Sequence, residues 1–209
     1  MRIVRWDMSY PIQPGAPGAI TLPEPRYIAR RNFFNFFGIK CRFTTLDGRP
    51  LFFVKLKAFR LREDITLFAD EALTRPLMSI KARQIIDFSA AYDIVDMTTQ
   101  TRVGALRRRG LKSILRDEWE ILDPSDQVIG IMQEDSQLMA LLRRFLSNLI
   151  PQNYHITMHG QPVATVTGTW NPFIVKHTMD LSPDQGQLFD QRLALAASVL
   201  LMTIEGKQG

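Results

Sequence analysis

The fold is decided by residues 193–204, which read LALAASVLLMTI. A helix with this sequence is apolar on every side, so it must be buried on every side. A helix that crosses a bilayer needs about 20 such residues, whereas this run is shorter and Glu205 and Lys207 follow it. At roughly 1.5 Å per residue the run rises about 18 Å, the depth of a small barrel. We therefore predict a helix over residues 190–204 that is threaded through a closed sheet.

Short alternating runs precede this helix, with turn residues about every ten positions. In the clearest run Ile39, Cys41 and Phe43 alternate with polar residues, and Asp47-Gly48, a strong hairpin signal, follows it. The other candidate strands are 52–58, 65–69, 77–82, 84–88, 91–96, 102–107, 118–122, 128–132, 154–158, 163–167 and 173–179. Their spacing favours a barrel or sandwich over βαβ units. With the apolar helix, it predicts a mainly β (α+β) fold, a twelve-stranded antiparallel barrel around a buried C-terminal helix.

The first 26 residues differ from the rest in composition. They hold five prolines, Pro11, Pro14, Pro17, Pro23 and Pro25. Proline fixes φ and lacks an amide donor, so this stretch cannot sustain a helix or a central strand. We predict an arm or linker over residues 1–26 and a single barrel domain over 27–209. A proline-rich ligand for a partner domain is the alternative interpretation of the arm.

A second helix is predicted at residues 135–150, where leucines and Phe145 recur at helical spacing and Pro151 follows. Its other face carries Arg143 and Arg144. The helix is therefore amphipathic, and three uses stay open: packing on the outside of the sheet, lying on a membrane surface, or binding a protein partner.

Composition limits the setting of the protein. Cys41 is the single cysteine, which excludes an internal disulfide and fits a reducing compartment. The N-terminus has no apolar segment of the secretory type. The net charge of +5 favours encounters with anionic partners. We expect a cytoplasmic protein, peripheral at a membrane in the lipid-binding interpretation, with no cofactor.

One basic run is a candidate anion-binding site. The residues assigned to it are Arg102, Arg107, Arg108, Arg109, Lys112 and Arg116. Clustered basic side chains near a membrane each contribute about 1 kcal/mol of attraction to acidic lipid. The alternative is a solvated loop whose arginines pair with Asp117, Glu118 and Glu120. We do not expect nucleic-acid binding, because no aromatic stacking platform accompanies these charges.

The order of elements resembles the tubby C-terminal-like superfamily, and more narrowly its LURP-one-related and phospholipid-scramblase-like branch. The resemblance rests on TLDGRPL at 45–51, WEILD at 119–123, VIGI at 128–131 and DQRLALAA at 190–197. It extends over residues 27–204 as a layout of elements. It implies a twelve-stranded barrel around a central helix, no enzymatic active site, and phosphoinositide recognition as a precedent among the tubby relatives.

The scramblase branch also implies a calcium-binding segment before the last helix, and the corresponding residues here are 180–186, DLSPDQG. Counted from Asp180, the position that needs glycine holds Gln185 and the position that needs glutamate holds Gln191. We predict a solvated acidic loop instead. The three histidines have no metal-binding motif, so no metal site is expected.

Two functions remain after these tests. The first is a non-enzymatic binding domain that meets an anionic lipid or membrane surface through the basic run. The second is a protein-interaction or regulatory scaffold with no lipid ligand, which would use residues 135–150 and the proline arm.

Overall fold

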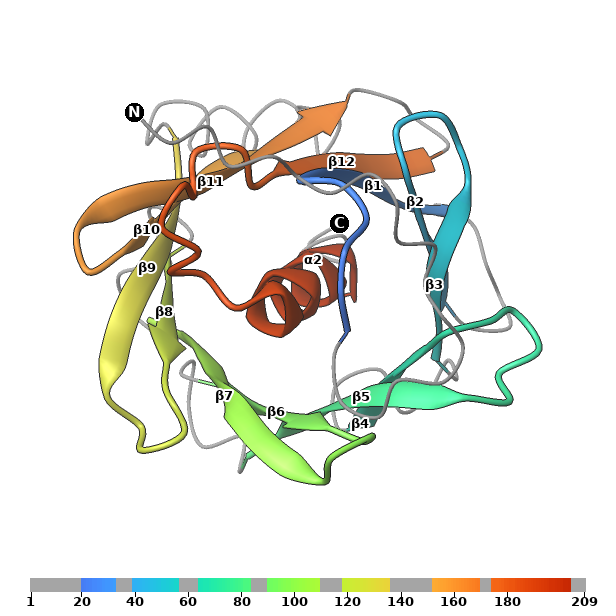
Figure 1. Ribbon diagram of the computed structural model, residues 1–209, viewed down its shortest axis with the longest axis horizontal. Coiled ribbons are helices and arrows are strands. Elements are labelled where there is room, and N and C mark those ends of the chain that lie inside the picture. The colour runs from blue at the N-terminus through green and yellow to red at the C-terminus, as the bar shows by residue number, and fades with distance from the viewer. Residues whose placement is uncertain are drawn as a thin grey trace, which may run out of the picture.

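Twelve antiparallel strands form a closed barrel, and one helix runs through it (Figure 1). The computed structural model describes residues 20–32, 39–56, 64–83, 90–109, 118–135, 152–169 and 174–203. Strands that are neighbours in sequence are neighbours in the barrel, and the first pairs with the last. The strands are β1 (Arg26–Asn32), β2 (Ile39–Thr44), β3 (Pro50–Leu56), β4 (Asp64–Phe68), β5 (Pro76–Ala82), β6 (Ala91–Asp96), β7 (Thr101–Arg108), β8 (Glu118–Leu122), β9 (Val128–Glu134), β10 (Asn153–Met158), β11 (Gln161–Thr169) and β12 (Ile174–Asp180).

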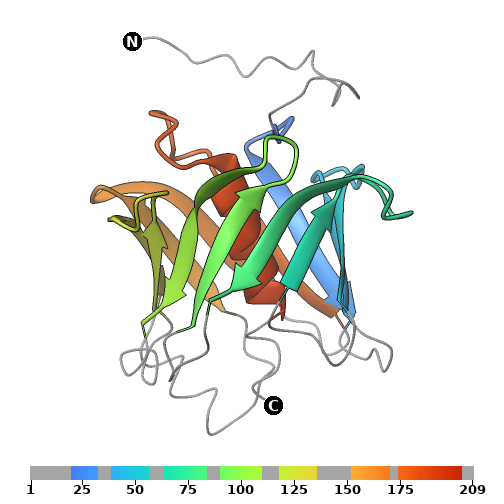
Figure 2. The same cartoon turned by 90° about the horizontal axis from the view of Figure 1, so that it is seen from below.

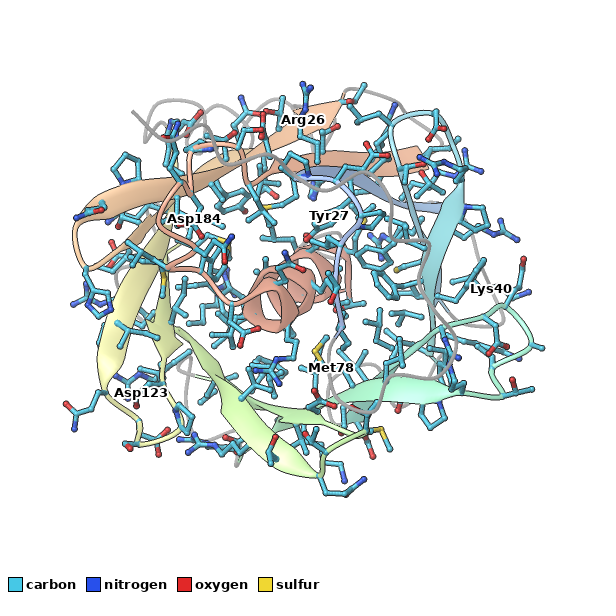
Figure 3. The ribbon with its side chains drawn as sticks, in the orientation of Figure 1. Arg26, Tyr27, Lys40, Met78, Asp123 and Asp184 are labelled. Carbon is cyan, nitrogen blue, oxygen red and sulfur yellow. The ribbon has the colours of Figure 1, made fainter. Side chains whose placement is uncertain are left out.

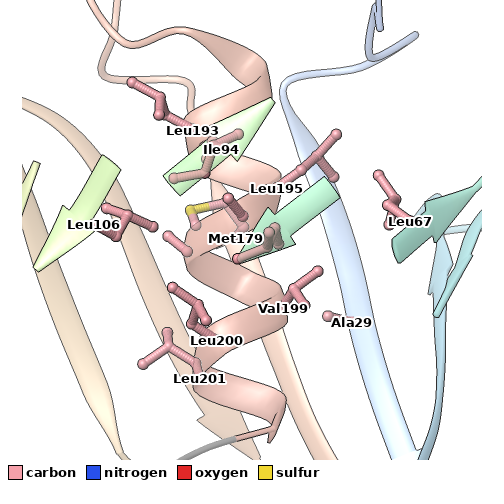
Figure 4. Packing of buried hydrophobic residues seen from close by; sticks show 14 of the residues in the cluster. Ala29, Leu67, Ile94, Leu106, Met179, Leu193, Leu195, Val199, Leu200 and Leu201 are labelled. Carbon is pink, nitrogen blue, oxygen red and sulfur yellow. The ribbon is translucent and has the colours of Figure 1, made fainter. Parts of the chain in front are cut away.

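Helix α2 (Gln191–Thr203) fills the lumen. Its side chains are buried without a break from Leu193 to Thr203. Figure 4 shows Leu193, Val199 and Leu200 on the helix facing apolar side chains of the strands, among them Ile94 and Leu106. The predicted threaded helix and the predicted barrel are both confirmed. The helix and the barrel depend on each other, because the helix needs an apolar surface on all sides and a barrel of this size needs side chains to fill its interior.

A polar contact fixes the helix within this apolar lumen. The hydroxyl of Tyr27 on β1 lies 3.0 Å from the carbonyl oxygen of Ala194, to which it donates. It also shares a hydrogen bond of 2.9 Å with the Ser198 hydroxyl. Both side chains are buried, so each needs this partner. The pair sets the height of α2 against β1.

The described hairpin connections, 45–49, 69–75, 97–100, 123–127 and 159–160, lie together at one end of the barrel, which we call the hairpin end (Figure 2). The linker 181–190 also lies there and leads into α2. Residues 20–25 reach this end too, where Ile20 and Leu22 are buried in the core. The Leu22 amide donates to the Gln191 side chain at 2.7 Å. The packed core therefore includes residues before the predicted start of the domain.

Strand β1 was not among the predicted strands. Tyr27, Ala29 and Arg31 face inward, and the buried arginine breaks the apolar alternation that identifies a strand from sequence. The predicted strand at 84–88, the predicted helix at 135–150 and most of the predicted arm fall outside the described residues. Within the described residues no helix is both long and apolar enough to cross a membrane.

Candidate functional site

The structure separates Arg102 from the rest of the predicted basic run. Arg102 lies toward the hairpin end of β7, roughly 16 Å along the strand from Arg107. Its Nε donates to Asp93 at 3.0 Å, and its guanidinium pairs with Asp126. Arg83 binds the same two carboxylates, so the four side chains form one network. Hydrogen bonds from Arg83 and then Arg102 lower the pKa of Asp126 to about 2.

Arg107 and Arg109 face outward and are paired with acids of β8. Arg107 Nε donates to Glu120 Oε2 at 2.7 Å, and Arg109 Nε lies 3.2 Å from Glu120 Oε1. Arg109 also pairs with Glu118, whose second oxygen accepts from Gln133 at 2.6 Å. These are the pairs with Glu118 and Glu120 that the solvated-loop interpretation predicted. The charges of Arg107 and Arg109 are thus compensated within the barrel wall.

Arg108 differs from its two neighbours. It follows Leu106 on the inward side of β7 and lies opposite the fully buried Trp119. Its Nε is buried. Because successive side chains of a strand point to opposite faces, a run of three arginines cannot present all three to one ligand. Lys112 and Arg116 fall outside the described residues.

The acidic side chains of the segment before α2 accept hydrogen bonds from backbone amides of the same segment and of the start of α2. Asp184 accepts hydrogen bonds of 2.8 Å from the amides of Leu188 and Phe189. Asp190 accepts from the Arg192 amide at 2.8 Å and so caps α2. These carboxylates stabilise the linker. Among the described residues no cluster of three His, Cys, Asp or Glu side chains is arranged to hold a metal ion.

Two titratable side chains inside the barrel, Cys41 and His177, have pKa values that keep them uncharged at neutral pH. Burial raises the pKa of the Cys41 thiol to about 12, against the opposing charge of Arg31. Burial and Arg31 together lower the pKa of His177 to about 4. At neutral pH the first is a protonated thiol and the second a neutral imidazole. Neither is therefore an activated nucleophile or a poised general acid.

A second basic surface lies on the outer wall of β12, β1, β2 and β3. We call it the strand face, and its residues are Arg30, Lys40, Arg42, Lys55 and Lys176. The register sets like charges directly opposite each other: Arg30 faces both Arg42 and Lys176, and Lys40 faces Lys55. Arg42 pairs with Glu71 at 2.5 Å. For the other four, no ion pair is found with any described residue.

The strand face is exposed and has an aromatic border. Arg30, Lys40 and Lys55 are exposed, and Figure 3 shows Lys40 on the outside of the wall. Arg42 lies opposite Phe53 of β3, which in turn lies opposite Phe68 of β4, and both aromatic side chains are half-buried. The alternation in the sequence marks Lys40 and Lys55 as outward positions of their strands. Their place beside Arg30 and Lys176 depends on the closure of the barrel between β1 and β12, which the sequence pattern does not contain.

The family profile of LURP-one-related proteins matches residues 50–202, which is most of the chain. The chain belongs to the LURP-one-related family. A search of curated proteins finds no match to it, and a search of solved structures finds none either. The family resemblance and the fold expected from it are confirmed.

The LURP-one-related segment includes Arg107 and Arg109 but only part of the strand face. It begins with β3, so Lys55 and Lys176 lie inside the matched residues. Arg30, Lys40 and Arg42, on β1 and β2, lie before them. The strand face is therefore assembled across the boundary of the family match.

Proposed function

We propose that this LURP-one-related chain is a non-enzymatic binding domain that docks on an anionic membrane surface through basic side chains of its outer wall. The observation that carries the proposal is the occupied lumen. Helix α2 fills the interior with apolar side chains. A barrel filled in this way presents its wall and its ends to ligands, and the wall carries groups of cationic side chains.

The charge balance of the chain supports an anionic partner. The net charge is +5, and basic side chains at a membrane surface each contribute about 1 kcal/mol of attraction to acidic lipid. Such attraction falls with salt, because the screening length shortens from about 10 Å at 0.1 M to about 3 Å at 1 M. Membrane binding by this route must therefore be salt-sensitive.

Co-sedimentation of the purified chain with vesicles tests the proposal. One set of vesicles contains phosphatidylcholine alone, and the other adds phosphatidylserine or a phosphoinositide. We expect sedimentation only with the acidic vesicles, reduced at high salt. Equal sedimentation with neutral vesicles, or none with either set, would contradict the proposal.

The pairing of Arg107 and Arg109 with Glu118 and Glu120 favours the second candidate, a protein-interaction or regulatory scaffold. In this case the compensated run only stabilises the wall, and residues 135–150 and the N-terminal arm make the contacts. A scaffold predicts no vesicle binding. It also predicts that changes at Arg107 and Arg109 leave partner binding intact while changes in 135–150 abolish it.

A further inference from the structure

The two basic surfaces of the barrel differ in how their charges are balanced. Arg107 and Arg109 each lie against a glutamate that is mostly buried, with side chains of Glu118 and Glu120 only 11% and 14% exposed. The strand face instead sets cation against cation at three cross-strand positions. Like charges directly opposite each other in a sheet are destabilising. Among the described residues only Arg42 of the strand face has an acidic partner, Glu71, so this face is less compensated than Arg107 and Arg109.

The two surfaces also lie on opposite sides of the molecule. In the closed order of strands, β1 and β7 are as far apart around the ring as two strands can be (Figure 1). A planar surface that lies against the side of the barrel at β1 and β2 does not reach β7 and β8. Side-on docking must therefore use one surface or the other.

We infer that the strand face, Arg30, Lys40, Arg42, Lys55 and Lys176, is the surface that docks side-on against an anionic membrane. This inference rests on the proposed function. Neighbouring strands are about 4.8 Å apart and alternate residues about 6.7 Å apart, so the five cations form a close two-dimensional array. Acidic headgroups diffuse laterally in a bilayer and can collect under such an array, which relieves the repulsion between the cations.

The shape of the strand face favours a membrane over a nucleic acid. Single-stranded nucleic acids are bound in a basic groove that follows the backbone, with aromatic rings between the charges. Here the cations spread over a convex wall, and Phe53 and Phe68 border them on one side. Half-buried aromatic side chains beside cations fit the interfacial layer of a bilayer, where apolar groups enter between headgroups.

Two triple variants with the same change in net charge test the inference. The first replaces the lysines of the strand face, Lys40→Gln, Lys55→Gln and Lys176→Gln. The second changes the run, Arg107→Gln, Arg109→Gln and Lys112→Gln, and leaves the inward Arg108 in place. Each charge at an acidic surface contributes about fivefold to binding. We therefore expect roughly a hundredfold weaker partition of the first variant to phosphatidylserine vesicles, and less than a fivefold change for the second.

Thermal unfolding supplies a readout that separates binding from folding. Removing facing cations relieves repulsion, so the first variant should unfold at the wild-type temperature or above it. The second variant leaves Glu118 and Glu120 without their arginines, so its midpoint should fall. If the first variant is less stable than wild type, the facing cations of the strand face do not destabilise the fold, and the inference is overturned.

Each remaining outcome has a distinct meaning. If the wild-type chain binds no acidic vesicles, the proposed function fails and the inference fails with it. If the wild type binds and the second variant loses binding, or both lose it equally, the strand face is not the docking surface, although membrane docking stands. If vesicles do not bind, and an oligonucleotide binds the wild type but not the first variant, the partner is a nucleic acid.

Discussion

His177 connects the inside of the barrel wall to the pH dependence of stability. It is buried on β12, where it lies opposite Ala29 of β1 and Gly168 of β11, and the charge of Arg31 on β1 acts on it. Burial and the charge of Arg31 lower its pKa from 6.5 to about 4. As the pH falls, His177 is therefore protonated in the unfolded chain at a higher pH than in the folded chain. Protonation of the unfolded chain lowers the free energy of unfolding, so this loss of stability begins near pH 6.5 and is complete near pH 4.

We predict that the free energy of unfolding falls by about 2 kcal/mol between pH 7 and pH 5 because of this one residue. The carboxylates with lowered pKa, such as Asp93, act mainly below that window. Urea unfolding at several pH values measures the slope, and His177→Phe is the comparison because it keeps a ring without titrating. An equal slope in the two proteins would show that another group is responsible.

Gly104 is required by the packing of β7 against β8. A Cβ at this position would lie 2.2 Å from the carbonyl oxygen of Leu122, a backbone atom that cannot move without disturbing the strand pair. We predict that Gly104→Ala lowers stability by about 3 kcal/mol or more. In the control, Gly186→Ala, the new methyl would meet only the flexible Leu188 side chain at 3.3 Å, and the loss should stay below about 1 kcal/mol. Comparable losses at both sites, measured by chemical denaturation, would contradict this account of β7.

At the scale of elements, α2 is the core of the domain. Leu200 is fully buried between the helix and the wall. We predict that Leu200→Ala lowers the free energy of unfolding by about 3–4 kcal/mol, since it leaves a cavity in a closed lumen that cannot collapse. Leu46→Ala makes the same chemical change in an exposed hairpin, where 45% of the side chain is accessible, and should cost less than about 0.5 kcal/mol. Guanidinium unfolding of both variants checks the difference.

The elements differ in how well the sequence predicts them. Helix α2 could be predicted because an all-apolar run of its length has few alternatives to a filled barrel. Strand β2 and the turn at Asp47 and Gly48 follow from strict alternation and a strong turn signal. Strand β1 could not be predicted in the same way, because its inward Arg31 breaks the pattern. Burial of that arginine is a property of the assembled wall.

The candidate site shows the same limit more sharply. A run of basic residues predicts a patch only if neighbouring side chains share a face, and in β7 they alternate. Arg102 joins the network with Asp93 and Asp126, and Arg107 and Arg109 bind glutamates that lie next to them only through the pairing of β7 with β8. The strand face needs the pairing of β1 with β12, the contact most distant in sequence. Its charges could be counted from the sequence, but their grouping could not.

At the scale of the whole molecule, closure of the barrel determines how the positive charge is distributed. The filled lumen leaves the wall and the ends to ligands in the proposed function. Within the described part of the chain, the ring of strands places Arg107 and Arg109 with their glutamates on one side, and on the other the strand face, where only Arg42 has an ion pair. In the proposed docking, this difference between the two sides gives the barrel a preferred side. Such asymmetry orients a protein at a charged surface before any specific contact forms.

Lysine acetylation in the presence and absence of phosphatidylserine vesicles tests this account most directly, because it reads single side chains in the unaltered protein. Lys40, Lys55 and Lys176 report on the strand face, Lys112 reports on the basic run, and Lys81, on β5 beside Asp64, serves as the control. We predict that vesicles slow the acetylation of Lys40, Lys55 and Lys176 several-fold and leave Lys81 and Lys112 unchanged. Two results would contradict this prediction. One is protection of Lys112 without protection of Lys40, Lys55 and Lys176. The other is that bound vesicles change none of the five acetylation rates.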